Sequence, residues 1–222
     1  MPGTLYIVAT PIGNMNDVSA RMTSTLQSVD VVFAEDTRVA KSLLHKLDIK
    51  VTVKRYDHHS HEKQIRHVLE ELEEGHDVAY VSDAGTPGIE DPGGRLVESV
   101  ARDLPEAPIV PISGPSAIIT ALSVCGFPAD KFNVMGFAPK KKGRQTYFDN
   151  VAASTITTVL YESTHRIHKT VDEIASRQPD RKMVIARELT KKFETIMRGT
   201  ASELVERLAT ASTKGEFVIV LE

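Results

Sequence analysis

The chain has 222 residues, which is enough for one large domain or two small ones with a substantial hydrophobic core. Apolar residues make up 41% of the chain and charged residues 26%, a composition that is typical of globular proteins and excludes disordered and fibrous ones. The net charge of -3 creates no overall positive field for nucleic acid, so any contact with RNA has to be local.

Cys125 is the single cysteine, which excludes an internal disulfide and a cysteine-rich metal site and fits a reducing cytoplasm. We expect it to be a small buried apolar residue. No apolar run approaches the roughly 20 residues of a membrane helix, and no basic leader precedes the first apolar run. These features predict a cytoplasmic protein that does not span a membrane.

Short apolar runs alternate with helix-like stretches in the first half of the chain. Continuous apolar runs suit strands that are covered on both faces, and the stretches between them have apolar residues at three- and four-residue spacing. This alternation predicts a βαβα arrangement with a mostly parallel sheet. The predicted strands are 5–9, 30–34, 77–82 and 108–112, and the predicted helices are 18–29, 38–47 and 62–75.

The rhythm changes in the second half, where strand-like segments follow one another closely. The segments 182–190 and 193–199 are near enough in the chain to form an antiparallel pair, which predicts a mixed α/β unit. We place the domain boundary near Ser113, giving an N-terminal α/β domain over 1–112 and a C-terminal α/β domain over 113–222. The other predicted elements are strands 155–163 and 216–222 and helices 164–177 and 201–210.

Four polar or glycine-rich loops follow the predicted strands of the first half. They read "TPIGN" (10–14), "EDTR" (35–38), "DAGTPGIEDPGG" (83–94) and "SGPSA" (113–117). Ligands of open α/β sheets bind beyond the carboxyl ends of the strands, and glycine and proline give a loop a defined shape. The four loops therefore predict one shared pocket.

Common motifs are absent from these loops: there is no phosphate loop, dinucleotide fingerprint, nucleophile elbow or H-E-x-x-H site. "DHHSHE" (57–62) lacks a second group of ligands, so we interpret it as an exposed helix start and expect no metal. "EDTR" could equally cap a helix, and "YESTHR" (161–166) could be a strand end before a capped helix. "KKKGR" (140–144) is either a solvated loop or a phosphate site.

Six motifs in this order and spacing resemble the tetrapyrrole methylase family, in particular its members that methylate the 2'-hydroxyl of a cytidine ribose in small-subunit ribosomal RNA. The resemblance covers essentially the whole chain. It implies a two-domain fold with S-adenosylmethionine in the inter-domain cleft and, usually, a homodimer. The six motifs are "ATPIGN", "AEDTR", "VSDAGTPGIEDPG", "SGPSA", "YESTHR" and "ARELTKKFE".

The resemblance also implies which residues bind the cofactor. Ala9 and Ser113 depart from it, since relatives of this kind usually have proline there. The chain ends at "EFVIVLE" (216–222), where many relatives continue into a helical segment thought to grip RNA, so we expect RNA contacts elsewhere. The implied cofactor-binding residues are Pro11, Ile12, Gly13, Asp83, Gly85, Thr86, Pro87, Ile89, Ser116, Ala117, Tyr161 and Glu162.

Methyl transfer to a ribose hydroxyl needs the two reactants held in line, so positioning should dominate the rate. A carboxylate or lysine near the weakly acidic hydroxyl would orient or deprotonate it, and the catalytic candidates are Asp36, Glu188 and Lys191. We favour Asp36 because it follows a strand at the pocket edge, although it could merely pin Arg38. The predicted RNA-binding cations are Arg38, Lys140, Lys141, Lys142, Arg144, Arg166 and Arg187.

Two other functions remain open from the sequence. One is C-methylation of a small tetrapyrrole such as a precorrin, and the other is a protein that senses a nucleotide-like ligand without catalysis. The cations of "AEDTR", "YESTHR" and "KKKGR" favour RNA, because a porphyrinoid pocket has less need of them at its rim. A steep salt dependence of binding would distinguish RNA from a neutral ligand.

Overall fold

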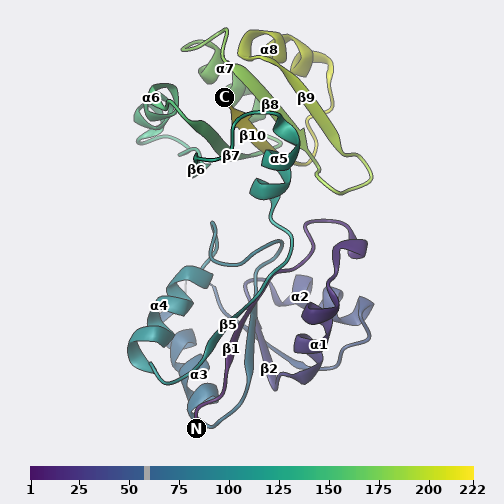
Figure 1. The fold of residues 1–222 in the computed structure, drawn as a ribbon, viewed down its shortest axis with the longest axis vertical. Coiled ribbons are helices and arrows are strands. Elements are labelled where there is room, and N and C mark those ends of the chain that lie inside the picture. Colours follow the sequence, from purple (N-terminus) through teal and green to yellow (C-terminus); the bar gives the residue numbers. More distant parts are fainter. Residues whose placement is uncertain (58–60) are drawn as a thin grey trace. The chain divides into compact units, whose positions relative to one another are not determined.

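The computed structural model of the protein describes residues 1–57 and 61–222. The chain forms two compact units, Met1–Ser116 and Ala117–Glu222, and each is an α/β unit with its own sheet (Figure 1). The boundary predicted near Ser113 lies in the loop that follows the last strand of the first unit.

The first unit contains a five-stranded sheet in the order β3-β2-β4-β1-β5, and all of its strand pairs are parallel. This confirms the predicted parallel sheet. Every residue of β2 and β4 is buried, as expected for strands covered on both faces. The short edge strand β3 was not predicted because its sequence, TVKR, has no apolar run. The strands are β1 Leu5–Val8, β2 Val31–Ala34, β3 Thr52–Arg55, β4 Val78–Val81 and β5 Ile109–Ile112.

Two helices cover each face of this sheet, α1 and α2 on one side and α3 and α4 on the other (Figure 1). Each helix pair contributes to a separate hydrophobic cluster with the strands. Helix α4 was not predicted, because its two leading glycines read as part of the preceding loop. The elements are α1 Ala20–Ser28, α2 Thr37–Lys46, α3 His61–Glu73 and α4 Gly93–Asp103, with a short 3-10 helix at Met15–Asp17.

The second unit contains a mixed sheet in the order β6-β7-β10-β8-β9. Only the β6–β7 pair is parallel, and β8 and β9 form the predicted antiparallel pair. The strand formed by the last residues, β10, lies at the centre of the sheet. The bounds are β6 Phe132–Phe137, β7 Thr157–Ser163, β8 Lys182–Arg187, β9 Thr195–Thr200 and β10 Glu216–Leu221.

Helices α6, α7 and α8 pack on one face of this second sheet and form its main hydrophobic cluster. Helix α5 packs against β10 with residues outside that cluster, and Cys125 at its end is buried, as predicted. Within the described ranges, no helix combines the length and apolar composition that crossing a membrane requires. The bounds are α5 Ala117–Cys125, α6 Arg144–Ala153, α7 Ile167–Ala175 and α8 Ala201–Thr210.

Candidate functional site

The loops that follow β1, β4 and β5 meet at one edge of the first sheet. Thr10 and Gly85 exchange two backbone hydrogen bonds of 3.0 and 3.1 Å, which join the β1 loop to the β4 loop. The hydroxyl of Thr86 donates to the backbone oxygen of Pro115 at 3.0 Å, which joins the β4 loop to the β5 loop. The carboxyl ends of parallel strands lie at the same edge, so three turns far apart in the sequence become neighbours.

The loop after β2 joins this group through Asp36. Its backbone N–H donates to a carboxylate oxygen of Asp83 at 3.1 Å, and its own carboxylate caps α2 by accepting from the N–H of Arg38 at 2.8 Å. The Arg38 guanidinium also donates to the Asp36 carboxylate, at 3.0 and 2.5 Å. These hydrogen bonds from Arg38 hold the pKa of Asp36 well below its usual value. Asp36 is therefore a carboxylate at neutral pH and a weak base.

The glycine-rich loop after β4 is organised by Asp91, which was not among the predicted site residues. Its carboxylate accepts from the N–H groups of Gly88 at 2.9 Å, Ile89 at 3.2 Å and Gly93 at 2.8 Å. The hydroxyl of Tyr80 also donates to it, at 3.3 Å. Gly88 has a φ of 91°, a conformation that side chains other than glycine rarely adopt. The only sequence signal for Asp91 was its place among glycines that leave N–H groups unpaired.

A cavity of about 530 Å³ opens beside these loops in the first unit. This volume lies within the range of about 300–1,000 Å³ that small-molecule sites occupy. Five of the predicted residues line it: Pro11, Gly13, Asp36, Arg38 and Asp83. The first unit thus brings predicted cofactor-binding and catalytic residues to one hollow.

Thr10 in the cavity lining and Gly85 in the neighbouring loop bear on ligand binding. Thr10 is only 2% exposed, and its hydroxyl has no hydrogen-bond partner among the described residues. Gly85 has a φ of 80°, and a Cβ there would lie 3.2 Å from the side chain of Ile12. The orphaned hydroxyl offers a ligand one polar contact, and the bare backbone of Gly85 lets the β4 loop pack closely against Ile12. Among the other predicted residues here, Pro87 is buried and Ile89 is 41% exposed.

In the second unit, Tyr161 and Glu162 lie near the end of β7, and the side chain of Glu162 is fully buried. Its carboxylate accepts from the hydroxyl of Thr170 at 2.6 Å and from the N–H of Ser163 at 2.7 Å, and it forms an ion pair with Arg166 at 3.3 Å. Because these partners occupy the carboxylate, a cofactor would meet the backbone of Glu162 or the half-buried ring of Tyr161.

Two predicted catalytic residues, Glu188 and Lys191, lie together. The Lys191 ammonium donates to Glu188 at 3.0 Å and to Glu216 at 2.7 Å. Burial acts to raise the pKa of Glu188, but the hydrogen bonds from the Glu216 N–H and from Lys191 outweigh it and lower this pKa. Burial acts to lower the pKa of Lys191, but the two carboxylates outweigh it and raise this pKa. Both groups are therefore charged and paired at neutral pH.

The predicted RNA-binding cations fall into two sets. Lys140, Lys141 and Lys142 are exposed, as is Arg38, whose guanidinium is paired with Asp36. The guanidinium of Arg187 is half-buried and donates to the backbone oxygen of Lys214 at 2.6 Å. Arg144 and Arg166 bind groups inside the second unit. The assignment of all seven to RNA stays a prediction, but these internal partners leave Arg144, Arg166 and Arg187 fewer donors for a phosphate.

The last predicted cofactor-binding residues, Ser116 and Ala117, are half-buried at the end of the first unit and the start of the second. The histidine-rich segment interpreted as an exposed helix start includes His58 and His59, which lie outside the described residues.

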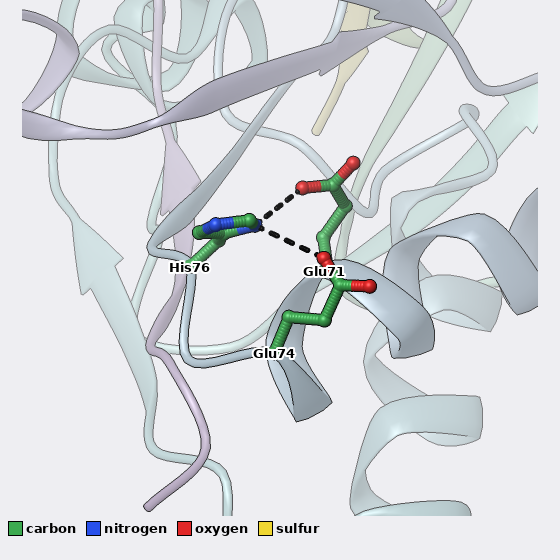
Figure 2. A group of neighbouring side chains, drawn as sticks. All are labelled: Glu71, Glu74 and His76. Carbon is green, nitrogen blue, oxygen red and sulfur yellow. Dashed lines mark hydrogen bonds and ion pairs between the residues drawn. The ribbon is translucent and has the colours of Figure 1, made fainter.

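A group of three side chains near the end of α3 has spacing that would admit a metal ion (Figure 2). Glu71, Glu74 and His76 place one ligand atom each within 4.8 Å of the others. Nδ1 of His76 lies 2.8 Å from Glu71, whose carboxylate also pairs with Lys54. The hydrogen bond from Lys54 is the main cause of the lowered pKa of Glu71. The ammonium already supplies positive charge here, so the group is explained as an ion-pair cluster.

Comparison with known proteins places these features in a family. The sequence pattern of the tetrapyrrole (corrin/porphyrin) methylases matches residues 4–205. A relative from Halalkalibacterium halodurans named "Ribosomal RNA small subunit methyltransferase I" is 41% identical over 99% of this chain and 76% of its own. A relative of the same name from Thermotoga maritima is also 41% identical, over 99% of this chain and 98% of its own.

The fold is also similar to a solved structure, that of uroporphyrin-III-C-methyltransferase from Thermus thermophilus. The TM-score is 0.65, and the match covers 98% of this chain and 94% of the other at 19% sequence identity. This likeness concerns the fold alone. Because the family pattern covers residues 4–205, which include the whole first sheet and all four loops of the first unit, the chain belongs to the tetrapyrrole methylase family.

Proposed function

We propose that the protein transfers a methyl group from S-adenosylmethionine to the 2'-hydroxyl of a cytidine ribose in small-subunit ribosomal RNA. One observation carries this proposal: relatives 41% identical over 99% of the chain have the name "Ribosomal RNA small subunit methyltransferase I". The fold neighbour that methylates a tetrapyrrole shares only 19% of the sequence, so tetrapyrrole methylation has weaker support.

The donor would be held by the loops that follow β1, β4 and β5. When bound, S-adenosylmethionine supplies an electrophilic methyl group. The unpaired hydroxyl of Thr10 and the neighbouring Pro11, both in the cavity lining, suit a ligand that has both polar and apolar parts. Asp91 keeps the glycine loop in one shape, so little conformational freedom is lost when a ligand binds.

The acceptor hydroxyl would be oriented more than deprotonated. The pKa of Asp36 is held low by Arg38, so its carboxylate is a good hydrogen-bond acceptor and a poor general base. Glu188 and Lys191 are paired with each other and with Glu216, which also makes them poor partners for proton exchange. The C–O bond would form as the methyl–sulfur bond breaks, and the hydroxyl proton would pass to solvent water. The proposed rate enhancement therefore comes mainly from alignment of the hydroxyl with the methyl group.

The decisive experiment uses purified protein, methyl-labelled S-adenosylmethionine and small ribosomal subunits from a strain that lacks the modification. We expect label on the 2'-oxygen of one cytidine ribose, located by nuclease mapping. Naked small-subunit RNA serves as a parallel substrate and tests whether the assembled subunit is required. Label that appears only on added tetrapyrrole precursors would overturn the proposal and favour carbon methylation.

The resemblance also leads us to propose that the protein acts in the cytoplasm as a homodimer. Sedimentation velocity across a range of protein concentrations tests the homodimer, and a single monomer species at all concentrations would contradict it.

A further inference from the structure

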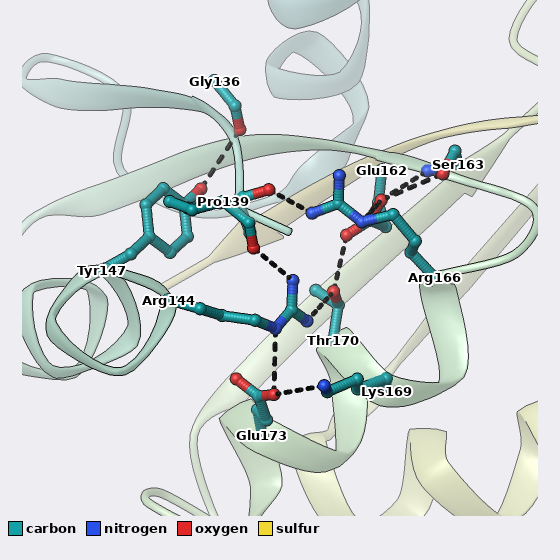
Figure 3. A network of polar contacts seen from close by, with 11 residues as sticks. Gly136, Pro139, Arg144, Tyr147, Glu162, Ser163, Arg166, Lys169, Thr170 and Glu173 are labelled. Atoms are coloured by element: carbon teal, nitrogen blue, oxygen red, sulfur yellow. Dashed lines mark hydrogen bonds and ion pairs between the residues drawn. The ribbon is translucent and has the colours of Figure 1, made fainter. Parts of the chain in front are cut away.

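Two arginines of the second unit hold consecutive backbone carbonyls at the start of one loop (Figure 3). The guanidinium of Arg166 donates to the oxygen of Ala138, and that of Arg144 donates to the oxygen of Pro139 at 3.1 Å. The next residues are Lys140–Lys142, the basic loop. The arginines thus reach the backbone immediately before the three lysines.

The same arginines belong to a buried polar network centred on Thr170 (Figure 3). The Thr170 hydroxyl accepts from Arg144 at 2.9 Å and donates to Glu162 at 2.6 Å. Arg144 also pairs with Glu173 at 3.0 Å, while Arg166 pairs with Glu162 at 3.3 Å. One connected set of charges therefore joins β7, α7 and the start of α6.

Burial makes the geometry of this network specific. The side chain of Glu162 is 0% exposed and that of Arg144 is 7% exposed, so neither charge is strongly hydrated. A buried charge without its partner is costly, and a fully satisfied network favours one arrangement over its alternatives. The carbonyls of Ala138 and Pro139 are two of the acceptors in that arrangement, so the base of the loop has a fixed position.

The basic loop itself is open to solvent. Its three lysines are exposed and have no ion-pair partner in the part of the chain that the structure describes. Gly143 turns the chain with a φ of 80° into α6, whose N-terminus has no side-chain cap. The first N–H groups of that helix add positive partial charge beside the lysines. In a protein with a net charge of -3, the basic loop is a local positive surface on a rigid base.

We propose that the basic loop binds RNA backbone phosphates, and that Arg144 and Arg166 are positioning residues that act through it without touching RNA. This inference rests on the proposed function and departs from the sequence-based assignment of all five cations to phosphate. Lysine ammonium groups suit it because each acts as a mobile point charge toward a phosphate. The guanidinium groups of Arg144 and Arg166 already donate hydrogen bonds to backbone carbonyls and Thr170 and form ion pairs with carboxylates.

The first test measures binding of unmodified small ribosomal subunits over a range of salt concentrations. We compare the wild type with a variant in which Lys140, Lys141 and Lys142 are all changed to Gln. Loss of three phosphate contacts should weaken binding at low salt at least about tenfold and reduce the salt slope by about 2, at roughly 0.7 per contact on single strands. Affinity for S-adenosylmethionine, measured by calorimetry, should stay within about twofold because the donor site remains intact.

The second test asks whether Arg144 works through the loop. Arg144→Lys keeps the charge but cannot reach Pro139, Thr170 and Glu173 together, so we expect about three- to tenfold weaker subunit binding. In the triple-Gln background the same change should have no further effect, because interacting sites are non-additive. Arg177→Lys is the matched control. Arg177 also lies over the Phe148 ring, 5.7 Å from its centroid against 4.9 Å for Arg144, but its guanidinium donates to Asp149 and to the backbone oxygen of Glu173, neither of which belongs to the basic loop.

Thr170→Val provides a second route that removes a single hydroxyl from the network. It should speed hydrogen exchange of the loop amides and weaken subunit binding as Arg144→Lys does. Additive losses in the triple-Gln background would show that Arg144 contacts RNA directly and would overturn its positioning role. Unchanged binding by the triple-Gln variant would overturn the basic loop as the RNA surface. Wild-type protein that fails to bind subunits would instead refute the proposed function itself.

Discussion

The two units build their loops in different ways. In the first unit the glycine loop after β4 is shaped by backbone conformation, with Gly88 at a φ of 91° and with Asp91 collecting neighbouring N–H groups. In the second unit the basic loop is held by side chains from other elements, through Arg144, Arg166 and Thr170. The first arrangement is encoded locally, and the second depends on residues scattered along the chain.

This difference predicts different responses to substitution. A loop shaped by its own backbone should lose function when one methyl group is added, with modest loss of stability. A loop held by a buried network should lose both stability and shape when one charge is removed, because the remaining partners stay buried.

The largest expected effect is that of Glu162→Ala. The substitution leaves Arg166 and Thr170 without their carboxylate, and we expect the free energy of unfolding to fall by about 3 kcal/mol, at the low end for a broken buried pair because Arg166 is partly exposed. Urea denaturation measures the change. Asp103→Asn, which breaks the exposed pair with Arg102, is the control and should leave stability nearly unchanged. Equal losses of unfolding free energy in the two variants would contradict a larger contribution of the buried network to stability.

Next in size is Gly85→Ala. A Cβ at this position meets Ile12 at 3.2 Å in a left-handed conformation, so we expect S-adenosylmethionine affinity to fall about 10- to 100-fold by calorimetry, or about 1.4–2.7 kcal/mol. Gly126→Ala is a matched control, because Gly126 has a φ of 82° and open space around its Cβ position. It shares the backbone strain without the contact. If Gly85→Ala and Gly126→Ala had similar affinities for S-adenosylmethionine, the glycine loop would not be part of the S-adenosylmethionine site.

Asp36→Asn should have a smaller effect on catalysis. The amide keeps the shape and can still cap α2, but it accepts hydrogen bonds less strongly than the carboxylate. We expect a rate of methylation about tenfold lower, below the range of about 10²–10⁴ for a full general base. Donor affinity should be nearly unchanged. A rate equal to that of the wild type would exclude Asp36 from the mechanism.

The smallest effect concerns pH. The pKa of Glu188 is lowered from 4.5 in the folded protein, so this carboxylate stabilises the fold at pH values above 4.5 and loses that contribution as the pH falls through the lowered value. Glu188→Gln should therefore be less stable than the wild type at pH 7, with the difference shrinking in acid. Urea denaturation at pH 7, 5 and 3 checks this, and a constant difference would contradict the lowered pKa.

The contrast also explains what the sequence could predict. The apolar runs that became β2 and β4 stand out because parallel strands inside a sheet are covered on both faces. Strands β1 and β5 are equally apolar in sequence, although some of their residues are partly exposed. The four loops after them were recognisable because glycine and proline mark unusual backbone locally. Their neighbourhood followed from the rule that parallel strands end at one edge.

Other elements had no such signal. Helix α5 is apolar nearly all round and α6 does not separate polar from apolar residues, so neither has a helical stripe. The network around Thr170 could not be predicted from the sequence, because its members lie on three separate elements. They are Glu162, Thr170 and Arg144. From the sequence, Arg144 was therefore grouped with the neighbouring lysines as an RNA-binding cation. Asp91 was missed for a related reason, since an acidic loop residue is common and its partners are backbone N–H groups.

The position of β1 in the first sheet has a consequence for synthesis of the chain. This strand is made before both of its neighbours, β4 and β5, and Leu5 pairs with Val78 and Ile109. At about 5–20 residues per second, a ribosome needs roughly 4 to 15 s to reach Val78, and longer to reach Ile109. During that interval the nascent apolar segment has no strand to pair with. Chaperone dependence of the newborn polypeptide should therefore centre on Leu5–Val8.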